Sequence, residues 1–171
     1  MSYQLFPRVF ENIMDNVRDE YDVAGVKPIY EFGTYLELTK VAKLNDLNRA
    51  VKYPLVWLVW EASESRKAWV NSSTYTLSPR IFICNSTKSE YSSDYRYTNN
   101  FEAILYPIWD LIKKYSSNST SVNSYSVKDF ETWEHLFWGE SLGMNKRENK
   151  LFDTLDALEI KINELKISPS C

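Results

Sequence analysis

Histidine, cysteine and glycine are all scarce in this sequence. Its only histidine, His135, excludes metal sites that need two histidine ligands. The two cysteines, Cys84 and Cys171, are too few for a disulfide framework and lack metal-ligand spacing. The four glycines form neither Gly-x-Gly-x-x-Gly nor Gly-x-x-x-x-Gly-Lys, the loops that let phosphates approach the backbone. We therefore expect no metal, no cofactor and no enzymatic activity.

The sequence also lacks long apolar runs and an excess of basic residues. No stretch reaches the roughly 18 consecutive apolar residues of a membrane helix, and the first residues do not resemble a secretory signal. These absences predict a soluble protein with no membrane contact in a reducing compartment. With a net charge of −3, the chain is not expected to hold nucleic acid by neutralising phosphates.

Aromatic residues, by contrast, are abundant. The chain has 171 residues, a length that predicts a single domain over 1–171. Six Trp, twelve Tyr and eight Phe make up 15% of it, more than one core of this size usually needs. Large amphipathic rings are enriched at protein interfaces. The surplus indicates a subunit that shares aromatic surface with copies of itself or with other proteins.

Three segments show helical spacing of apolar residues. The first follows Pro7, and its apolar positions are Val9, Phe10, Ile13, Met14, Val17 and Tyr21. A second helix is expected over about 34–44, after a short strand at 28–32. The clearest stripe comprises Phe101, Ile104, Leu105, Ile108, Trp109 and Ile112. Because Pro107 lacks a backbone donor, this helix is expected to kink or break near 103–107.

The strand pattern predicts a hairpin with a long arm. Residues 53–60 are almost continuously apolar, which is typical of a strand covered on both faces by a second internal layer or a partner subunit. This strand is expected to pair antiparallel with 74–85, where Pro79 favours an edge or a bulge. Residues 130–139 are ambiguous between strand and turn. The apolar parity flips between Ile162 and Leu165, which a β-bulge near Asn163 would explain.

Together these elements predict an α+β fold. We expect a small, mainly antiparallel sheet with two to three helices packed on one face. Extended loops are expected at about 61–73, 86–97 and 116–127, where polar and serine-rich stretches separate the apolar segments.

Two polar patterns have both a functional and a structural interpretation. A functional His135, which lies between Glu134 and Leu136, would act as a general base oriented by a carboxylate, but a surface or interface histidine is the favoured interpretation. Asp153, Asp156 and Glu159 have cation-site spacing, yet carboxylates three apart more often form a solvated face or a helix cap.

The aromatic residues have two interpretations as well. As contacts between subunits we predict Trp57, Trp60, Trp69, Tyr91, Tyr95, Trp133 and Trp138. The alternative is a monomeric binding module, for example for a glycan, in which Trp133, His135 and Trp138 form an aromatic patch.

The order of several short motifs resembles one group of viral proteins. Lys52-Tyr53-Pro54-Leu55 is followed by Leu105-Tyr106-Pro107-Ile108 and then by Trp138-Gly139. From about Ile29 to Ile167 the chain is similar to small neck and tail proteins of tailed bacteriophages and prophages of Bacteroidetes hosts, including crAss-like phages. At the fold level it resembles tail-terminator or head-to-tail joining proteins.

This resemblance implies a structural virion protein without catalytic residues. It implies a homo-oligomeric ring, six- or twelve-fold, around the DNA channel of the neck or tail, assembled in the host cytoplasm. The expected partners are the portal, an adaptor, and the tail tube or tail hub, while genomic DNA passes without sequence-specific binding. An acidic chain fits this role, because a surface that repels phosphate lets DNA slide.

Overall fold

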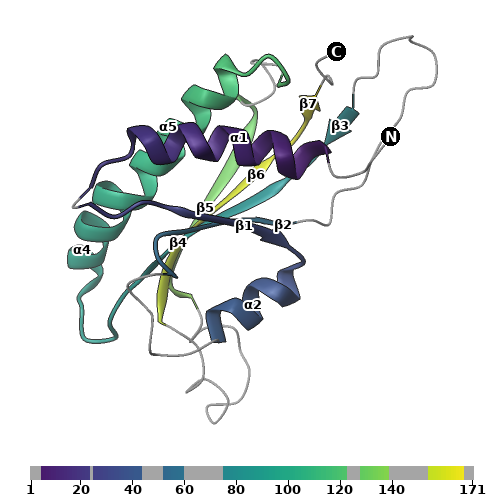
Figure 1. The fold of residues 1–171 in the computed structure, drawn as a ribbon. Helices are drawn as coiled ribbons and strands as arrows, with labels where there is room; N and C mark the ends of the chain where they lie inside the picture. The colour runs from purple at the N-terminus through teal and green to yellow at the C-terminus, as the bar shows by residue number, and fades with distance from the viewer. Residues whose placement is uncertain are drawn as a thin grey trace.

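A computed structural model describes residues 5–23, 25–43, 52–59, 75–122, 128–138 and 154–167. These residues form a mixed five-stranded sheet, a small two-stranded sheet and helices on both faces of the larger sheet (Figure 1). The helical elements are α1 (Leu5–Glu20), α2 (Tyr35–Lys43), α4 (Ser93–Arg96), η2 (Tyr97–Leu105) and α5 (Tyr106–Asn118). The strands are β1 (Ile29–Gly33), β2 (Leu55–Val59), β3 (Tyr75–Leu77), β4 (Arg80–Ser86), β5 (Phe130–Trp138), β6 (Leu155–Ile162) and β7 (Leu165–Ile167). The predicted α+β class is confirmed.

The large sheet has the strand order β1-β2-β4-β6-β5. Its neighbours are antiparallel except for β1 and β2, which run parallel. The predicted hairpin is confirmed, since β2 pairs with β4 from Leu55 opposite Cys84 to Val59 opposite Arg80. The ambiguous segment at 130–138 is a strand, which places β1 and β5 at the two ends of the sheet.

Next to the paired strands β4 and β6 lie two shorter strands. β3 precedes β4 and β7 follows β6 in the chain. Together, β3 and β7 form the two-stranded sheet, with Leu77 opposite Leu165. At this junction the Ile162 amide donates to the Pro79 carbonyl (3.0 Å), and the Ser78 hydroxyl donates to the Asn163 carbonyl (2.7 Å). The parity flip near Asn163 therefore marks a change from one sheet to the other, rather than a bulge within one strand. Pro79 lies between two strands, where it interrupts no ladder.

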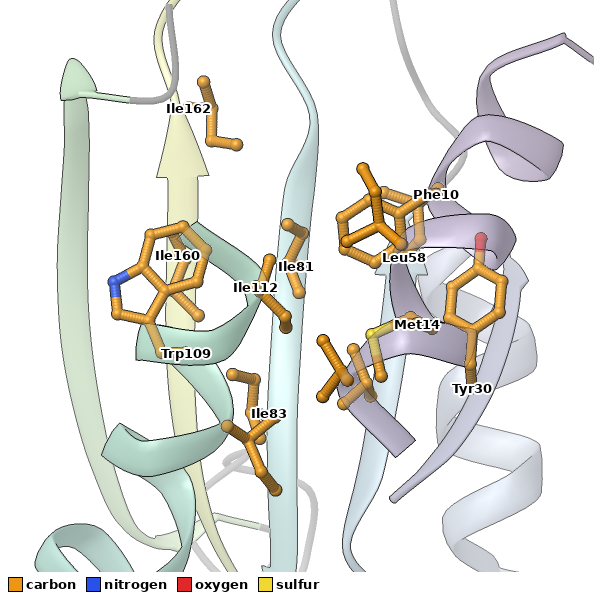
Figure 2. Close-up of a cluster of buried hydrophobic side chains, with 14 of the residues drawn as sticks. Phe10, Met14, Tyr30, Leu58, Ile81, Ile83, Trp109, Ile112, Ile160 and Ile162 are labelled. Atoms are coloured by element: carbon orange, nitrogen blue, oxygen red, sulfur yellow. The ribbon is translucent and has the colours of Figure 1, made fainter. Parts of the chain in front are cut away.

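The main core lies between the sheet and the helices α1, η2 and α5. All six apolar positions predicted for the first helix are buried, and Met14 and Val17 are fully enclosed. Figure 2 shows Met14 and Ile112, from α1 and α5, directed toward Leu58, Ile81 and Ile160 on three neighbouring strands. The aromatic ring of Trp109 packs edge-on against Phe130 of β5, with 5.1 Å between their centroids.

The opposite face of the sheet is covered by α2, which corrects the prediction that the helices share one face. Leu38 of α2 packs with a second cluster that contains Leu55, Trp57 and Phe82. A parallel pair such as β1 and β2 needs a connection that crosses over one face of the sheet, and α2 lies on that connection. The continuous apolar run at 53–59 is thus explained by a second internal layer.

The start of α2 is fixed by local hydrogen bonds. The Glu37 amide donates to the Thr34 hydroxyl (3.2 Å), and the Glu37 carboxylate accepts from the Thr34 amide (2.7 Å), which is a reciprocal capping box. Just before it, a Cβ on Gly33 would lie 2.8 Å from the Trp57 ring. Glycine therefore lets β1 and α2 approach this buried tryptophan.

The long helical segment begins earlier than predicted, and the change expected before Pro107 is present. The expected loop at 86–97 contains α4, which Ser92 caps by accepting a hydrogen bond from the Tyr95 amide. The break expected before Pro107 takes the form of the π-helix η2, in which the Tyr106 amide donates to the carbonyl of Phe101, five residues back. This wider helix accommodates a proline ring that would clash with the carbonyl four residues back in a regular α-helix.

The other two expected loops are described only in part. The segment 61–73 lies outside the described residues. At 116–127, α5 continues to Asn118 and Val122 forms a bridge with Ile167, while 123–127 are not described.

Truncation of Leu58 should separate core packing from surface effects. Leu58 is fully buried on β2, so Leu58→Ala is expected to lower the free energy of unfolding by about 2–5 kcal/mol. Leu36→Ala removes the same atoms from a side chain that is 63% exposed, and should change it by less than about 0.5 kcal/mol. Urea unfolding followed by circular dichroism measures both, and equal losses would contradict the assigned core.

Candidate interaction surfaces

Large apolar side chains are exposed at both ends of the sheet. On one side, Phe32 belongs to β1, and Val26 and Leu36 lie in the segments that flank this strand. On the other side, Trp133 and Leu136 belong to β5. We call the first set the β1 surface and the second the β5 surface. Phe32 is 52% exposed and Trp133 is 42% exposed, so each ring offers substantial apolar area.

The β1 surface arises because α1 covers only part of the strand's face. Tyr30 is buried against Phe10 of α1 and donates a hydrogen bond to the Pro7 carbonyl (3.2 Å). Phe32 stacks on Tyr30 with 6.3 Å between the centroids, yet it is half exposed. Two residues with the same apolar pattern therefore differ in burial, because the second lies at the end of the strand.

The β5 surface combines the exposed tryptophan with a charged cluster. Trp133 pairs with Glu159 of β6, and His135 pairs with Ala157, so both side chains lie on the α2 face. The His135 Nε2 atom lies 2.8 Å from Glu159 Oε2, and Arg80 Nε lies 3.2 Å from Glu159 Oε1. On the other face, Tyr106 donates a hydrogen bond to Glu134. His135 thus has the carboxylate partner of a general base, although that partner is Glu159 and not Glu134.

The predicted contact residues are found in different environments. Trp133 and Tyr95 are exposed, and Tyr91 is half-buried with its ring 4.5 Å from that of Tyr95. The prediction that Trp57 contacts a neighbouring subunit is wrong, because Trp57 is buried under α2 within its own subunit. Trp60, Trp69 and the Trp138 side chain lie outside the described residues, although the Trp138 backbone pairs with Leu155.

Sequence reasoning missed Phe32, Leu36, Tyr97 and Leu136 as exposed apolar residues. Phe32 alternates with Tyr30 like a core residue, and only the limited reach of α1 separates the two. Tyr97, on η2, stacks on the buried Phe101 with 6.0 Å between the centroids, yet it is itself 41% exposed. Nothing in their spacing distinguishes them from core positions.

A buried polar network joins the helical segment to the sheet. Arg96 and Asp156 are both fully buried, with Arg96 Nη1 3.2 Å from Asp156 Oδ1. The Asn100 amide donates to the second Asp156 oxygen (2.5 Å) and accepts from Asn85 (2.8 Å). The Arg96 guanidinium also donates to the Lys88 carbonyl (2.5 Å) and the Tyr91 carbonyl (3.1 Å). With these partners, the charges hold α4 and η2 against β4 and β6.

This network also bears on the cation site that the spacing of Asp153, Asp156 and Glu159 suggested. Asp156 faces Arg96 on η2's side of β6, whereas Glu159 lies on the α2 side with His135. These two carboxylates therefore point away from each other, and Asp153 lies outside the described residues. Within the described ranges, no group of three potential metal ligands comes together.

Cys84 is fully enclosed in β4, and burial raises the pKa of its thiol. Because the thiolate is the nucleophile, this cysteine is an inert part of the core.

Comparisons with known proteins do not assign this chain to a family. No protein-family model matches this chain, and no similar sequence is found among curated proteins. Among the described helices, none is both long and apolar enough to span a membrane.

The buried ion pair should be a strong stability determinant. Asp156→Ala leaves the Arg96 charge buried without its partner, so it is expected to lower the free energy of unfolding by about 3–5 kcal/mol. The matched control is Glu90→Ala, which removes the partner of Lys88 from an exposed pair and should leave stability within error. Chemical denaturation of both variants compares them, and similar small losses would show that the network contributes little.

Proposed function

We propose that this chain is a structural subunit that assembles with copies of itself into a ring in the neck or tail of a tailed bacteriophage. The observation that carries the proposal is the exposure of apolar side chains at both ends of one sheet, on Phe32 at β1 and on Trp133 at β5. Covering an exposed aromatic side chain with a partner removes its apolar surface from water and so favours association.

The positions of the two surfaces favour a ring over a simple dimer. Four strand spacings separate β1 from β5, about 19 Å at roughly 4.8 Å per spacing. A contact between different surfaces of identical subunits is head-to-tail, and it gives a ring when the rotation between subunits closes and an open filament when it does not. A two-fold dimer, in contrast, uses one self-complementary surface and would leave the other exposed.

The placement in a virion rests on the motif order. In the structure those motifs occupy turning points of the fold: Tyr53 and Pro54 precede β2, Pro107 follows the junction of η2 and α5, and Trp138 ends β5. The Pro54 carbonyl accepts a hydrogen bond from the Ile29 amide (2.9 Å), which helps to join β1 to β2. Two of the motifs thus lie beside strands of the large sheet and one lies at a helix junction, and we take this distribution as compatible with the proposed resemblance.

The proposed environment follows from that assignment. The ring would contact a portal or adaptor on one side and a tail tube or hub on the other. Genomic DNA would pass through it, and the negative net charge supports passage without binding.

The mass of the purified protein tests the assembly. Light scattering coupled to size-exclusion chromatography, at increasing concentration, is expected to show a discrete oligomer, and negative-stain images should show closed rings. The oligomer mass should change little when ionic strength rises, because the exposed side chains that carry the proposal are apolar. A monomer at every concentration, also when mixed with purified phage portal and tail proteins, would contradict the proposal.

A glycan-binding module is the second candidate, favoured by one observation. The exposed Trp133 ring lies on the same sheet face as the His135–Glu159 pair, so an apolar platform and hydrogen-bonding groups are neighbours.

Tryptophan fluorescence during glycan titrations separates the two candidates. If the chain is a ring subunit, the emission should not respond to glycans. A saturable response that Trp133→Ala abolishes and Trp133→Phe retains would support the binding module instead.

A further inference from the structure

We propose that neighbouring subunits join by strand pairing, with β1 of one copy adding antiparallel to β5 of the next, so that the sheet continues around the ring. The inference rests on the proposed ring function and specifies its contact. Among the described residues, no strand is paired with the outer edge of β1 or of β5. Such edges carry backbone donors and acceptors that a strand from another chain can satisfy.

The strand directions permit this pairing without turning a subunit over. β1 runs parallel to β2, and the three following neighbours, β4, β6 and β5, alternate in direction. β5 therefore runs opposite to β1. When a second copy is placed beside the first in the same orientation, β1 meets β5 as an antiparallel pair, and the helix layers of both copies stay on matching sides.

The side chains on the two edges also match. On the α2 face, β1 presents the exposed Glu31, whose backbone position is opposite Trp57 of β2. On the same face, β5 presents Trp133 and His135. Opposing Glu31 to His135 places the carboxylate beside an imidazole ring rather than beside another acidic residue of β5. This register also keeps Glu31 four residues from Glu131, the acidic residue of β5 on the same face.

The exposed apolar side chains lie on different faces of the sheet. Phe32 is on the α1 face with Tyr30, and Trp133 is on the α2 face, so each would contact the neighbouring subunit on its own face. Phe32 and Trp133 are the half-exposed aromatic residues nearest to the two edges, and Leu136 lies in the irregular part of β5 between His135 and Trp138. A second copy is the one partner that brings both surfaces together repeatedly, since each subunit offers one β1 and one β5. The structure thus favours a copy of this chain over an unrelated protein.

Two complementary lysine variants test the pairing. Phe32→Lys blocks the β1 edge and Trp133→Lys blocks the β5 edge, and both residues are exposed enough for the variants to fold. Each variant alone is expected to be a monomer, whereas an equal mixture should form a species of twice the monomer mass. Tyr97→Lys is the matched control, because Tyr97 is an exposed aromatic residue on η2, and this variant should assemble like the wild type.

The outcomes separate this inference from the proposed function. A wild-type oligomer that either lysine variant still forms alone would overturn the strand pairing and leave the ring intact. A wild type that never assembles would overturn both. Circular dichroism of each variant shows whether a loss of assembly comes from misfolding.

Disulfide trapping gives an independent readout. In a Cys171→Ser background, the double variant Glu31→Cys/His135→Cys should form a ladder of covalent multimers under mild oxidation. Opposed strand residues have Cα atoms about 4.5–5.5 Å apart, within disulfide range. The two positions in one subunit lie at opposite ends of the sheet, so they cannot react with each other. Neither single variant should form the ladder, and its absence from an assembled double variant would refute the register.

Discussion

The two-sided burial of the central strands is the constraint on which the rest of the structure depends. β2 is buried along its whole length, and β4 and β6 send apolar side chains to both faces. Each face then requires its own cover, which α1, η2 and α5 provide on one side and α2 on the other. Covering both faces uses most of the large apolar side chains of the described residues. The large apolar side chains that remain exposed among the described residues lie mainly at the two ends of the sheet.

Local patterns identified most elements, but not the side of the sheet on which they pack. The stripes in α1 and α5 were clear because their apolar residues repeat at helical spacing, and the strand at 53–60 was recognisable from its continuous apolar run. That run left two covers open, an internal layer or a partner. The parallel pairing of β1 and β2, a contact between distant segments, shows that the second cover is the internal layer formed by α2. Because local patterns do not reveal this pairing, Trp57 could not be recognised as a core residue.

The polar residues were the hardest to interpret from the sequence. Arg96 stood in a segment expected to be a loop, and Asp156 stood in an apparent cation motif. Their pairing joins residues 60 positions apart, which no local pattern reveals. His135 likewise found its carboxylate on β6 rather than in the adjacent Glu134. In each case the partner is determined by strand register, which depends on the whole sheet.

The enclosed position of Cys84 has a consequence for how the layers of this protein separate. Its sulfur sits at the centre of β4, under the layer that α2 forms, and burial keeps it protonated. A reagent can reach it only when that layer lifts from the strands, and such excursions have their own free energy, below that of complete unfolding. Chemical modification of this thiol would therefore report opening of the layer that α2 forms over β4.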